Sequence, residues 1–259
     1  MELISFRGVS VVRSGKPILR DLNWEVSSGQ RWVIIGPNGA GKTTLLSIVA
    51  SYLFPSGGEV RILGSKLGAI DTAELKTRIG MTSAALMNLV PDDEQVGNIV
   101  LSSAYAVFGR WREEYDPWDE SRSSALLSAL GVKDLKERFF STLSEGEKKR
   151  VMIARALMPD PELLLMDEPA AGLDLGGRED LLRRISDLSF DPIAPATVMV
   201  THHLEEIPIG TTHLLVLKDG TSVAQGRIEE VLTSELLSEL YGMKLELDSR
   251  YGRYFARSI

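Results

Sequence analysis

A glycine-rich segment between an apolar run and a helix-like run carries the first recognisable chemistry of this chain. Gly36, Gly41, Lys42 and Thr43 fit the pattern G-x-x-x-x-G-K-[ST], whose glycines let backbone N–H groups converge on phosphate oxygens. The following helix adds the positive end of its dipole. We expect Lys42 to reach the β- and γ-phosphates and the Thr43 hydroxyl to bind Mg²⁺. The predicted nucleotide-binding residues of this loop are Gly36, Pro37, Asn38, Gly39, Ala40, Gly41, Lys42, Thr43 and Thr44.

Two adjacent carboxylates, Asp167 and Glu168, follow the apolar run 163–166. Such a run is typical of a buried strand, and neighbouring side chains on a strand point in opposite directions. The two acids can therefore have different roles. We expect Asp167 to hold the water shell of Mg²⁺ and Glu168 to orient or deprotonate an attacking water. Together with the upstream loop, they predict nucleotide hydrolysis with Glu168 and Lys42 as catalytic residues.

A second Ser/Gly segment, Leu143–Glu147, lies between the phosphate-binding loop and the two carboxylates. Ser144 and Glu147 have the S-x-x-E spacing of a capping box, which satisfies backbone N–H groups at a helix start. The same helix start, with a serine hydroxyl and Gly146, can also bind an anion. The two interpretations are compatible, and the position ahead of Asp167 favours a functional role.

Alternating strands and helices must position these groups. Strands are predicted at 3–12, 18–26, 31–35, 59–63, 162–166 and 197–200, and helices at 43–52, 145–157 and 178–188. From 92 to 137 the pattern is helix-like, with Leu126, Leu127 and Leu130 spaced as a helical core face. Asp219-Gly220 between two short runs predicts a hairpin. This alternation implies an α/β fold with a mainly parallel sheet.

The composition excludes several classes of protein. The 259 residues include 29 basic and 36 acidic side chains, and the net charge of −7 argues against a general nucleic-acid binder. The chain has no cysteine, so disulfides and thiolate metal sites are excluded. No secretory signal is evident, and no apolar run approaches the ~20 residues that cross a bilayer. We therefore expect a cytoplasmic protein whose membrane association, on the inner face, comes through a partner.

The ordered motifs together resemble those of ABC-type ATPases. Segment 143–150 resembles the signature motif. The glycine-rich loop 36–44 resembles Walker A, and the apolar run with Asp167 and Glu168 resembles Walker B. Segment 171–174 resembles the D-loop, and Thr201-His202 resembles the switch histidine. The resemblance covers Leu3 to Gly242. It implies that two nucleotide-binding domains face each other head to tail and share ATP. Ser144 and Gly146 would then act on nucleotide bound to the partner subunit, and Asp174 would communicate across the interface.

His202 is one of two neighbouring histidines after the strand predicted at 197–200. Successive side chains at a strand end point in different directions. The place beside the carboxylate-bearing strand suits a contact with the γ-phosphate. We assign this catalytic role to His202 rather than to His203.

Two positions depart from the family pattern. Segment 78–84 resembles the stretch that ends in the Q-loop glutamine, but Ala84 occupies that place and has no polar atom. We expect that coupling to a membrane partner runs through another group or is weak. At the A-loop position, judged from Ile18-Leu19, an arginine replaces the usual aromatic residue. The Arg13 guanidinium can stack on adenine, although an ordinary surface arginine is an open alternative.

The sequence thus predicts a P-loop nucleotide hydrolase core with an antiparallel β subdomain and a helical subdomain. We expect one nucleotide-binding domain with core segments 1–84 and 160–225, a helical subdomain at 85–159 and a C-terminal extension at 226–259. The predicted function is ATP hydrolysis with Mg²⁺ by a homodimer, or by paired nucleotide-binding subunits, that powers separate transmembrane subunits. The alternative is a soluble ABC-type ATPase that acts as a regulatory or assembly switch. The transported substrate and the role of segment 243–259 are not readable from the sequence.

Aromatic and charged residues alternate in segment 108–118. They could form a docking surface for a membrane subunit, because the family places that contact on the helical subdomain. The alternative is that they pack the small core of that subdomain.

Overall fold

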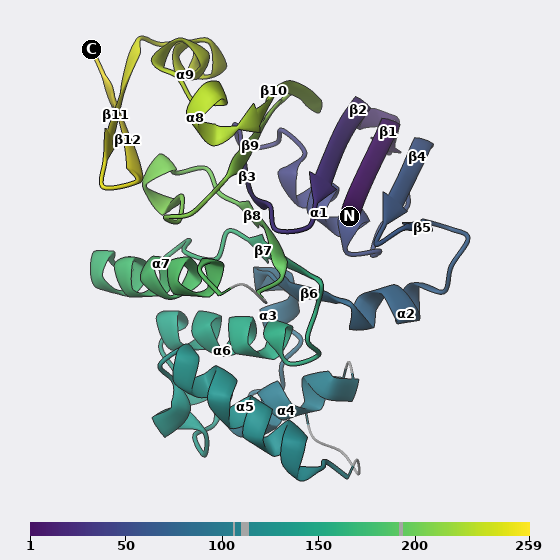
Figure 1. Ribbon diagram of the computed structural model, residues 1–259, viewed down its shortest axis with the longest axis vertical. Helices are drawn as coiled ribbons and strands as arrows, with labels where there is room; N and C mark the ends of the chain where they lie inside the picture. The colour runs from purple at the N-terminus through teal and green to yellow at the C-terminus, as the bar shows by residue number, and fades with distance from the viewer. Residues whose placement is uncertain (106, 110–113, 192–193) are drawn as a thin grey trace.

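A six-stranded sheet, in the order β10-β9-β3-β8-β7-β6, forms the centre of the protein (Figure 1). The computed structural model describes residues 1–105, 107–109, 114–191 and 194–259. Strands β6, β7, β8, β3 and β9 run parallel, and β10 pairs antiparallel with β9. The predicted α/β fold is confirmed. The strands are β3 (Arg31–Ile35), β6 (Ile79–Thr82), β7 (Leu163–Asp167), β8 (Ala196–Val200), β9 (His213–Lys218) and β10 (Thr221–Arg227).

A separate antiparallel sheet, ordered β2-β1-β4-β5, lies on one side of the central sheet (Figure 1). Its inward side chains are buried, and Phe6 and Trp24 pack edge to face with ring centroids 5.8 Å apart. Leu19, Leu22 and Val26 belong to the same buried cluster. Ile18 and Leu19 of this sheet lie against Gly41 in the phosphate-binding loop. Its strands are β1 (Glu2–Arg13), β2 (Lys16–Ser27), β4 (Gly57–Ile62) and β5 (Ser65–Lys66).

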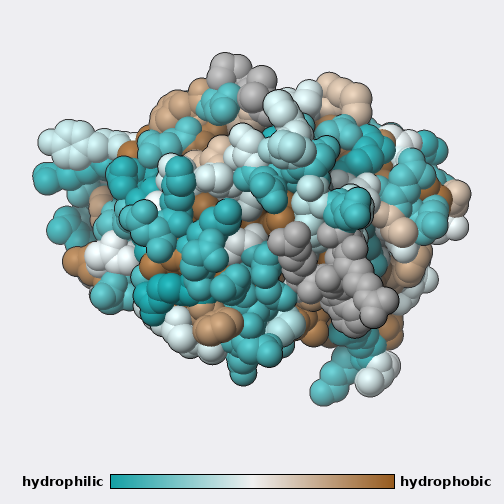
Figure 2. Space-filling view, turned by 90° about the horizontal axis from the view of Figure 1, so that it is seen from below, coloured by the Kyte–Doolittle hydropathy of each residue, from teal (hydrophilic) through white to brown (hydrophobic). Residues whose placement is uncertain are grey.

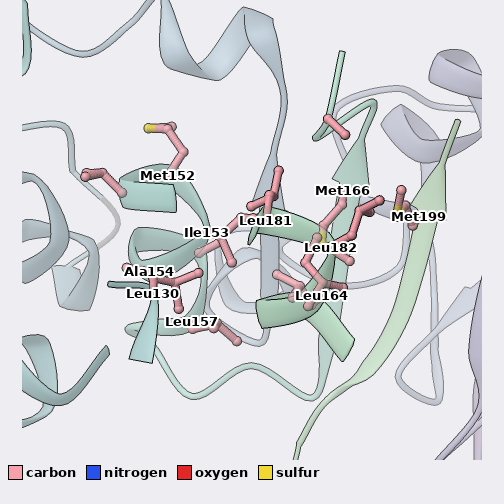
Figure 3. Close-up of a cluster of buried hydrophobic side chains, with 14 of the residues drawn as sticks. Leu130, Met152, Ile153, Ala154, Leu157, Leu164, Met166, Leu181, Leu182 and Met199 are labelled. Atoms are coloured by element: carbon pink, nitrogen blue, oxygen red, sulfur yellow. The ribbon is translucent and has the colours of Figure 1, made fainter. Parts of the chain in front are cut away.

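Helices cover the central sheet and form the lower end of the molecule in Figure 1. Side chains from α6, α7, β7 and β8 form one buried cluster in which Ile153, Leu164, Leu182 and Met199 lie close together (Figure 3). The α-helices up to α7 are α1 (Lys42–Val49), α2 (Thr72–Thr77), α3 (Ala84–Met87), α4 (Val96–Leu101), α5 (Pro117–Ala129), α6 (Glu145–Leu157) and α7 (Leu175–Ser189). The short 3₁₀ turns are η1 (Ser102–Tyr105), η2 (Lys133–Leu135), η3 (Phe140–Thr142) and η4 (Leu204–Glu206).

An ion-pair cluster joins α6 to α7. Arg184 and Arg183 donate to Asp180 at 2.9 and 2.7 Å, and Arg150 on α6 also donates to it. Burial alone would raise the pKa of Asp180, but these hydrogen bonds and charges lower it to about 2. The cluster therefore depends on an ionised Asp180.

Two predicted helix boundaries differ from the structure. The helix predicted at 43–52 ends at Val49, because Ser51 has a left-handed backbone with φ 59°. The helix predicted at 178–188 begins earlier, at Leu175, because the Asp174 carboxylate accepts from the Gly177 N–H at 2.7 Å and caps it. Two glycines in the first turn are poor helix formers and hide this start in the sequence.

Segment 108–118 is only partly described. Phe108 packs against the helical core, and the Arg155 guanidinium lies 3.8 Å from its ring centroid. Trp118 is 75% exposed, whereas Trp111 lies outside the described residues. The face seen from below, where α4 and α5 lie, is mainly hydrophilic with separate hydrophobic side chains (Figure 2). The described part of the segment thus contributes to core packing as well as to the surface.

The C-terminal segment folds into elements that the sequence did not reveal: α8 (Ile228–Val231), α9 (Ser234–Tyr241) and an antiparallel hairpin of β11 (Leu245–Arg250) and β12 (Arg253–Ser258). The hairpin stands apart from the antiparallel β1–β2–β4 sheet and ends the chain (Figure 1). Among the described residues, no helix is both long and apolar enough to span a membrane.

Candidate functional site

The phosphate-binding loop leaves the central strand β3 and enters α1, as the mechanism requires. Gly36 has φ 151°, and a Cβ there would lie 2.0 Å from the Leu217 carbonyl oxygen. Gly41 has φ 99° and packs against Leu19 of β2, where a Cβ would lie 2.6 Å from that side chain. Both positions therefore require glycine. Gly41 offers no side-chain cap to α1, so the first N–H groups of this helix remain available to an anion.

The Lys42 ammonium is folded back into its own loop. It donates to the carbonyl oxygens of Gly36 at 2.8 Å and Pro37 at 3.0 Å, and the residue is buried. Burial lowers the pKa of Lys42, while the nearby carboxylates of Glu168 and Asp167 act in the opposite direction. These two hydrogen bonds hold the ammonium within the loop.

Asp167 ends strand β7 beside the start of α1. The Thr43 hydroxyl donates to Asp167 Oδ1 at 3.4 Å, although the two residues are 124 positions apart. Burial raises the pKa of Asp167, and the hydrogen bond from Thr43 opposes this shift. Hard oxygen donors of this kind suit Mg²⁺, which proteins usually hold through one or two side chains plus substrate phosphates. Among the described residues, no group of three or more histidine, cysteine, aspartate or glutamate side chains could hold a metal ion.

Sheet register brings Glu168 to His202. Asp167 pairs with Val200 across the parallel strands β7 and β8, so the residues that follow each strand meet at the same edge. The Glu168 N–H donates to the Val200 carbonyl at 3.0 Å, and His202 Nδ1 lies 3.0 Å from Glu168 Oε1. Glu168 has a left-handed backbone with φ 48°, a strained conformation that often marks functional sites. The His203 ring is tilted by 44° against the His202 ring, with the two ring centroids 4.1 Å apart.

The turn after His202 is held by a buried pair. The Thr201 hydroxyl donates to the Glu206 carboxylate, and both residues are almost fully buried. The Thr201 N–H also donates to Ile34 of β3 at 3.2 Å. Sequence analysis missed this pair, because a threonine and a glutamate five residues apart match no helix or strand spacing.

Ser144, Gly146 and Asp174 are assembled at two helix starts. The capping box predicted for Ser144 is confirmed: Glu147 Oε2 accepts from the Ser144 N–H at 2.7 Å and from its hydroxyl at 2.9 Å. Asp174 caps α7. A Cβ at Gly146 would lie 3.7 Å from Leu173, so the signature segment and the D-loop segment lie against each other.

A cleft of about 760 Å³ opens between the phosphate-binding core and the helical part of the chain. Ala84 lies at the start of α3 and lines this cleft with Thr43, Asp167 and Glu168. Its methyl group offers no polar atom to this cleft, as the sequence indicates. Ser144, Gly146 and Asp174 are not among the residues that line it.

Lys149 is a second residue whose place sequence analysis did not foresee. It lines the same cleft, and its ammonium donates to the Ala171 carbonyl in the D-loop segment. Burial lowers the pKa of Lys149. Its position four residues after Glu145, on the same helix face, is the signal that could have found it.

Arg13 lies at the exposed tip of the β1–β2 hairpin, paired with Lys16. The hairpin continues into Ile18 and Leu19, which contact Gly41 of the phosphate-binding loop. The position of Arg13, at the tip of a hairpin that contacts this loop, is therefore compatible with the predicted stacking on a base.

Comparison with known proteins supports the same family. The sequence profile described as ABC transporter matches residues 19–171. The uncharacterised ABC transporter ATP-binding protein YlmA of Bacillus subtilis (strain 168) is 43% identical over 242 residues, which span 92% of this chain and 90% of the relative. The ferric enterobactin transport ATP-binding protein FepC of Escherichia coli (strain K12) is 32% identical over 230 residues, which span 88% and 82%.

A solved structure gives the same fold. The structure of cbiO1 from Clostridium perfringens, part of the ABC transporter complex cbiONQ, has a TM-score of 0.77 and 25% identity and covers 88% of this chain and 90% of that chain. The geometry of the glycine-rich loop, the two adjacent carboxylates and these similarities all indicate the same family. The chain belongs to the ABC transporter family, as an ATP-binding and ATP-hydrolysing subunit that powers a separate transmembrane partner.

Proposed function

We propose that the residues grouped at the carboxyl edge of the central sheet bind and hydrolyse Mg²⁺-ATP. The observation that carries this proposal is the pair of contacts Thr43–Asp167 at 3.4 Å and Glu168–His202 at 3.0 Å. Thr43 and Asp167 supply oxygen ligands to the magnesium ion and its water shell, and the bound ion would neutralise phosphate charge. Lys42 leaves its loop carbonyls to bind the β- and γ-phosphates.

In this proposal Glu168 orients the attacking water and accepts its proton. His202 holds the Glu168 carboxylate in place and contacts the γ-phosphate. The gain comes from positioning and from charge stabilisation, because phosphoryl transfer needs little covalent help from the protein. Loop residues 36–44 bind the phosphates, and Arg13 stacks on the adenine.

Two copies of the chain, or this chain with a similar subunit, enclose each ATP. Ser144 and Gly146 of one copy contact the γ-phosphate held by the loop of the other, and Asp174 contacts the opposite copy. This arrangement is supported by the two helix starts that Ser144 and Asp174 cap, which lie against each other where Gly146 meets Leu173. We also propose the division into a core (1–84, 160–225), a helical subdomain (85–159) and an extension (226–259).

We further propose that the partner transports a ferric chelate and that this chain binds to its inner, cytoplasmic side. The 32% identity to FepC, whose name specifies ferric enterobactin transport, supports this assignment. The test has two stages. The tagged chain is purified from detergent-solubilised membranes, and uptake of ferric enterobactin labelled with radioactive iron is compared in cells that carry the wild-type chain or Glu168→Gln.

Co-purification of a polytopic membrane protein and iron uptake only with the wild-type chain are expected. Recovery of soluble proteins alone contradicts the proposed membrane partner. No iron uptake with the wild-type chain, in cells that have no other route for this chelate, contradicts the substrate class, and equal uptake with both chains contradicts the role of Glu168. A labelled amino acid serves as the control solute, whose uptake stays the same in both strains.

A further inference from the structure

One arginine of the C-terminal hairpin connects two elements that flank the proposed hydrolytic residues. Arg253, the first residue of β12, donates to the two carboxylate oxygens of Glu179 at 2.8 and 3.2 Å. Its second terminal nitrogen also donates to the backbone carbonyl of Glu205. A single guanidinium thus binds α7 on one side and the η4 turn on the other.

Both residues that Arg253 binds belong to elements next to the proposed hydrolytic site. Glu179 lies on α7, the helix that Asp174 caps. Glu205 lies in η4, which directly follows the pair of histidines. The next residue, Glu206, is 3% exposed and accepts from the Thr201 hydroxyl. The backbone of His202 is therefore enclosed between Thr201 and a turn that Arg253 holds.

The contact is built into the packing of the hairpin. The Arg253 side chain is only 17% exposed. The hairpin turn lies against the segment after η4, because a Cβ on Gly252 would be 3.5 Å from the Ile209 side chain. By contrast, Arg257 in the same strand makes an exposed ion pair with Glu246 within the hairpin, at 2.7 Å, with its own side chain 75% exposed. Arg253 therefore connects the hairpin to other elements, whereas Arg257 makes its ion pair within the hairpin.

We propose that Arg253 is a positioning residue for ATP hydrolysis, which holds η4 against α7 so that His202 stays at Glu168. This inference rests on the proposed roles of Glu168 and His202. It also gives the C-terminal hairpin a function: the hairpin stiffens the switch-histidine turn from outside the nucleotide site. The planar fork of an arginine donates to both carboxylate oxygens and to the carbonyl in a fixed geometry, whereas the ammonium of a lysine has three donors on one atom and no bidentate fork.

The test compares Arg253→Ala with Arg253→Lys and with the matched control Arg257→Ala. Steady-state ATP hydrolysis is measured at a temperature where circular dichroism shows each variant fully folded. We expect Arg253→Ala to lower kcat roughly 10-fold, since even a ~1 Å misplacement of a catalytic group can cost about 10²-fold. The KM for ATP stays close to wild type, because Arg253 contacts no residue of the phosphate-binding loop. The kcat of Arg253→Lys lies between those of Arg253→Ala and the wild type, and Arg257→Ala keeps the wild-type kcat.

A charge swap separates positioning from stability. Arg253→Glu combined with Glu179→Arg restores the ion pair, but a carboxylate at position 253 cannot donate to the Glu205 carbonyl. We expect the swap to recover the melting temperature and not kcat. Full recovery of kcat in the swap, or a wild-type kcat in folded Arg253→Ala, overturns the inference.

Two further variants keep this inference distinct from the proposed function. If Glu168→Gln and His202→Ala both hydrolyse ATP at the wild-type rate, the proposed roles of these residues fail, whatever Arg253 does. If both variants lose hydrolysis and Arg253→Ala does not, the positioning role of Arg253 alone is wrong.

Discussion

Replacing Ser144 with alanine separates the capping role of this serine from its proposed role at the nucleotide. The serine hydroxyl accepts from the Glu147 N–H at 3.4 Å, which is long for a hydrogen bond. Loss of this cap should cost about 0.5 kcal/mol, the low end of the range for a serine cap. Both replacements also remove the 2.9 Å bond from the Ser144 hydroxyl to Glu147, but only Glu147→Ala removes the 2.7 Å bond from the Ser144 N–H, so Glu147→Ala should cost more, about 1 kcal/mol.

Glu147→Ala is expected to lose more stability, but Ser144→Ala should lose more ATP hydrolysis if Ser144 contacts the phosphate. A hydrogen bond to a charged group is worth about 1.5–3 kcal/mol, which corresponds to roughly 10- to 100-fold in rate. Ser144→Ala should therefore lower kcat/KM by that factor, whereas Glu147→Ala leaves the hydroxyl in place and has a smaller effect. Thermal melting and phosphate release of both variants provide the assay.

The reasoning fails if Ser144→Ala retains more than half of wild-type hydrolysis. It also fails if activity follows stability, with Glu147→Ala the less active variant. Either result would mean that the serine acts only as a helix cap.

Three further predictions follow from single side chains. Glu168→Gln should reduce hydrolysis about 10²- to 10⁴-fold while nucleotide binding and an ATP-bound dimer persist; undiminished phosphate release would refute its role. Gly36→Ala should lower thermal stability and nucleotide affinity, because its Cβ would lie 2.0 Å from the Leu217 carbonyl oxygen; Gly39→Ala, where φ is 83°, shares the backbone strain but meets nothing within 4 Å, so it should lower thermal stability less. Because the pKa of Asp180 is about 2 in the folded protein, below its unfolded value of about 3.9, its stabilisation of about 2 kcal/mol is present above pH 5 and lost as the pH falls to 2. The gap in unfolding free energy between wild type and Asp180→Asn should close over that range, and a constant gap would contradict this assignment.

The sequence predicted the elements whose patterns are local. The phosphate-binding loop lies between β3 and α1 because its glycines and its flanking apolar run are contiguous in the chain. The hairpin at Asp219-Gly220 and the capping box at Ser144 were predictable for the same reason, since each depends on residues that are close together in the chain. Strand β7 with its two acids was also predicted, since a fully buried strand is a continuous apolar run.

Features that depend on distant contacts were not predictable. The hairpin of β11 and β12 alternates too weakly to be read as strands, and Arg253 finds Glu179 only because α7 and the hairpin fold together. Strand β6, within segment 78–84, was not predicted as a strand, because its four residues carry little periodicity. The contact between Glu168 and His202 is set by the register of β7 and β8, which no local pattern specifies.

The account depends on ATP being shared between the phosphate-binding loop of one copy and the signature segment of the other. The chain has no cysteine, so Asn38→Cys and Gly146→Cys can be introduced separately, with different tags, into the Glu168→Gln chain. Asn38 is exposed in the loop, and the nearest side-chain atom to a Cβ at position 146 is 3.7 Å away, so both changes are tolerated. The account predicts a crosslink between the two tagged chains that forms with ATP and a short bifunctional maleimide. An ATP-bound dimer that gives no such crosslink would contradict it.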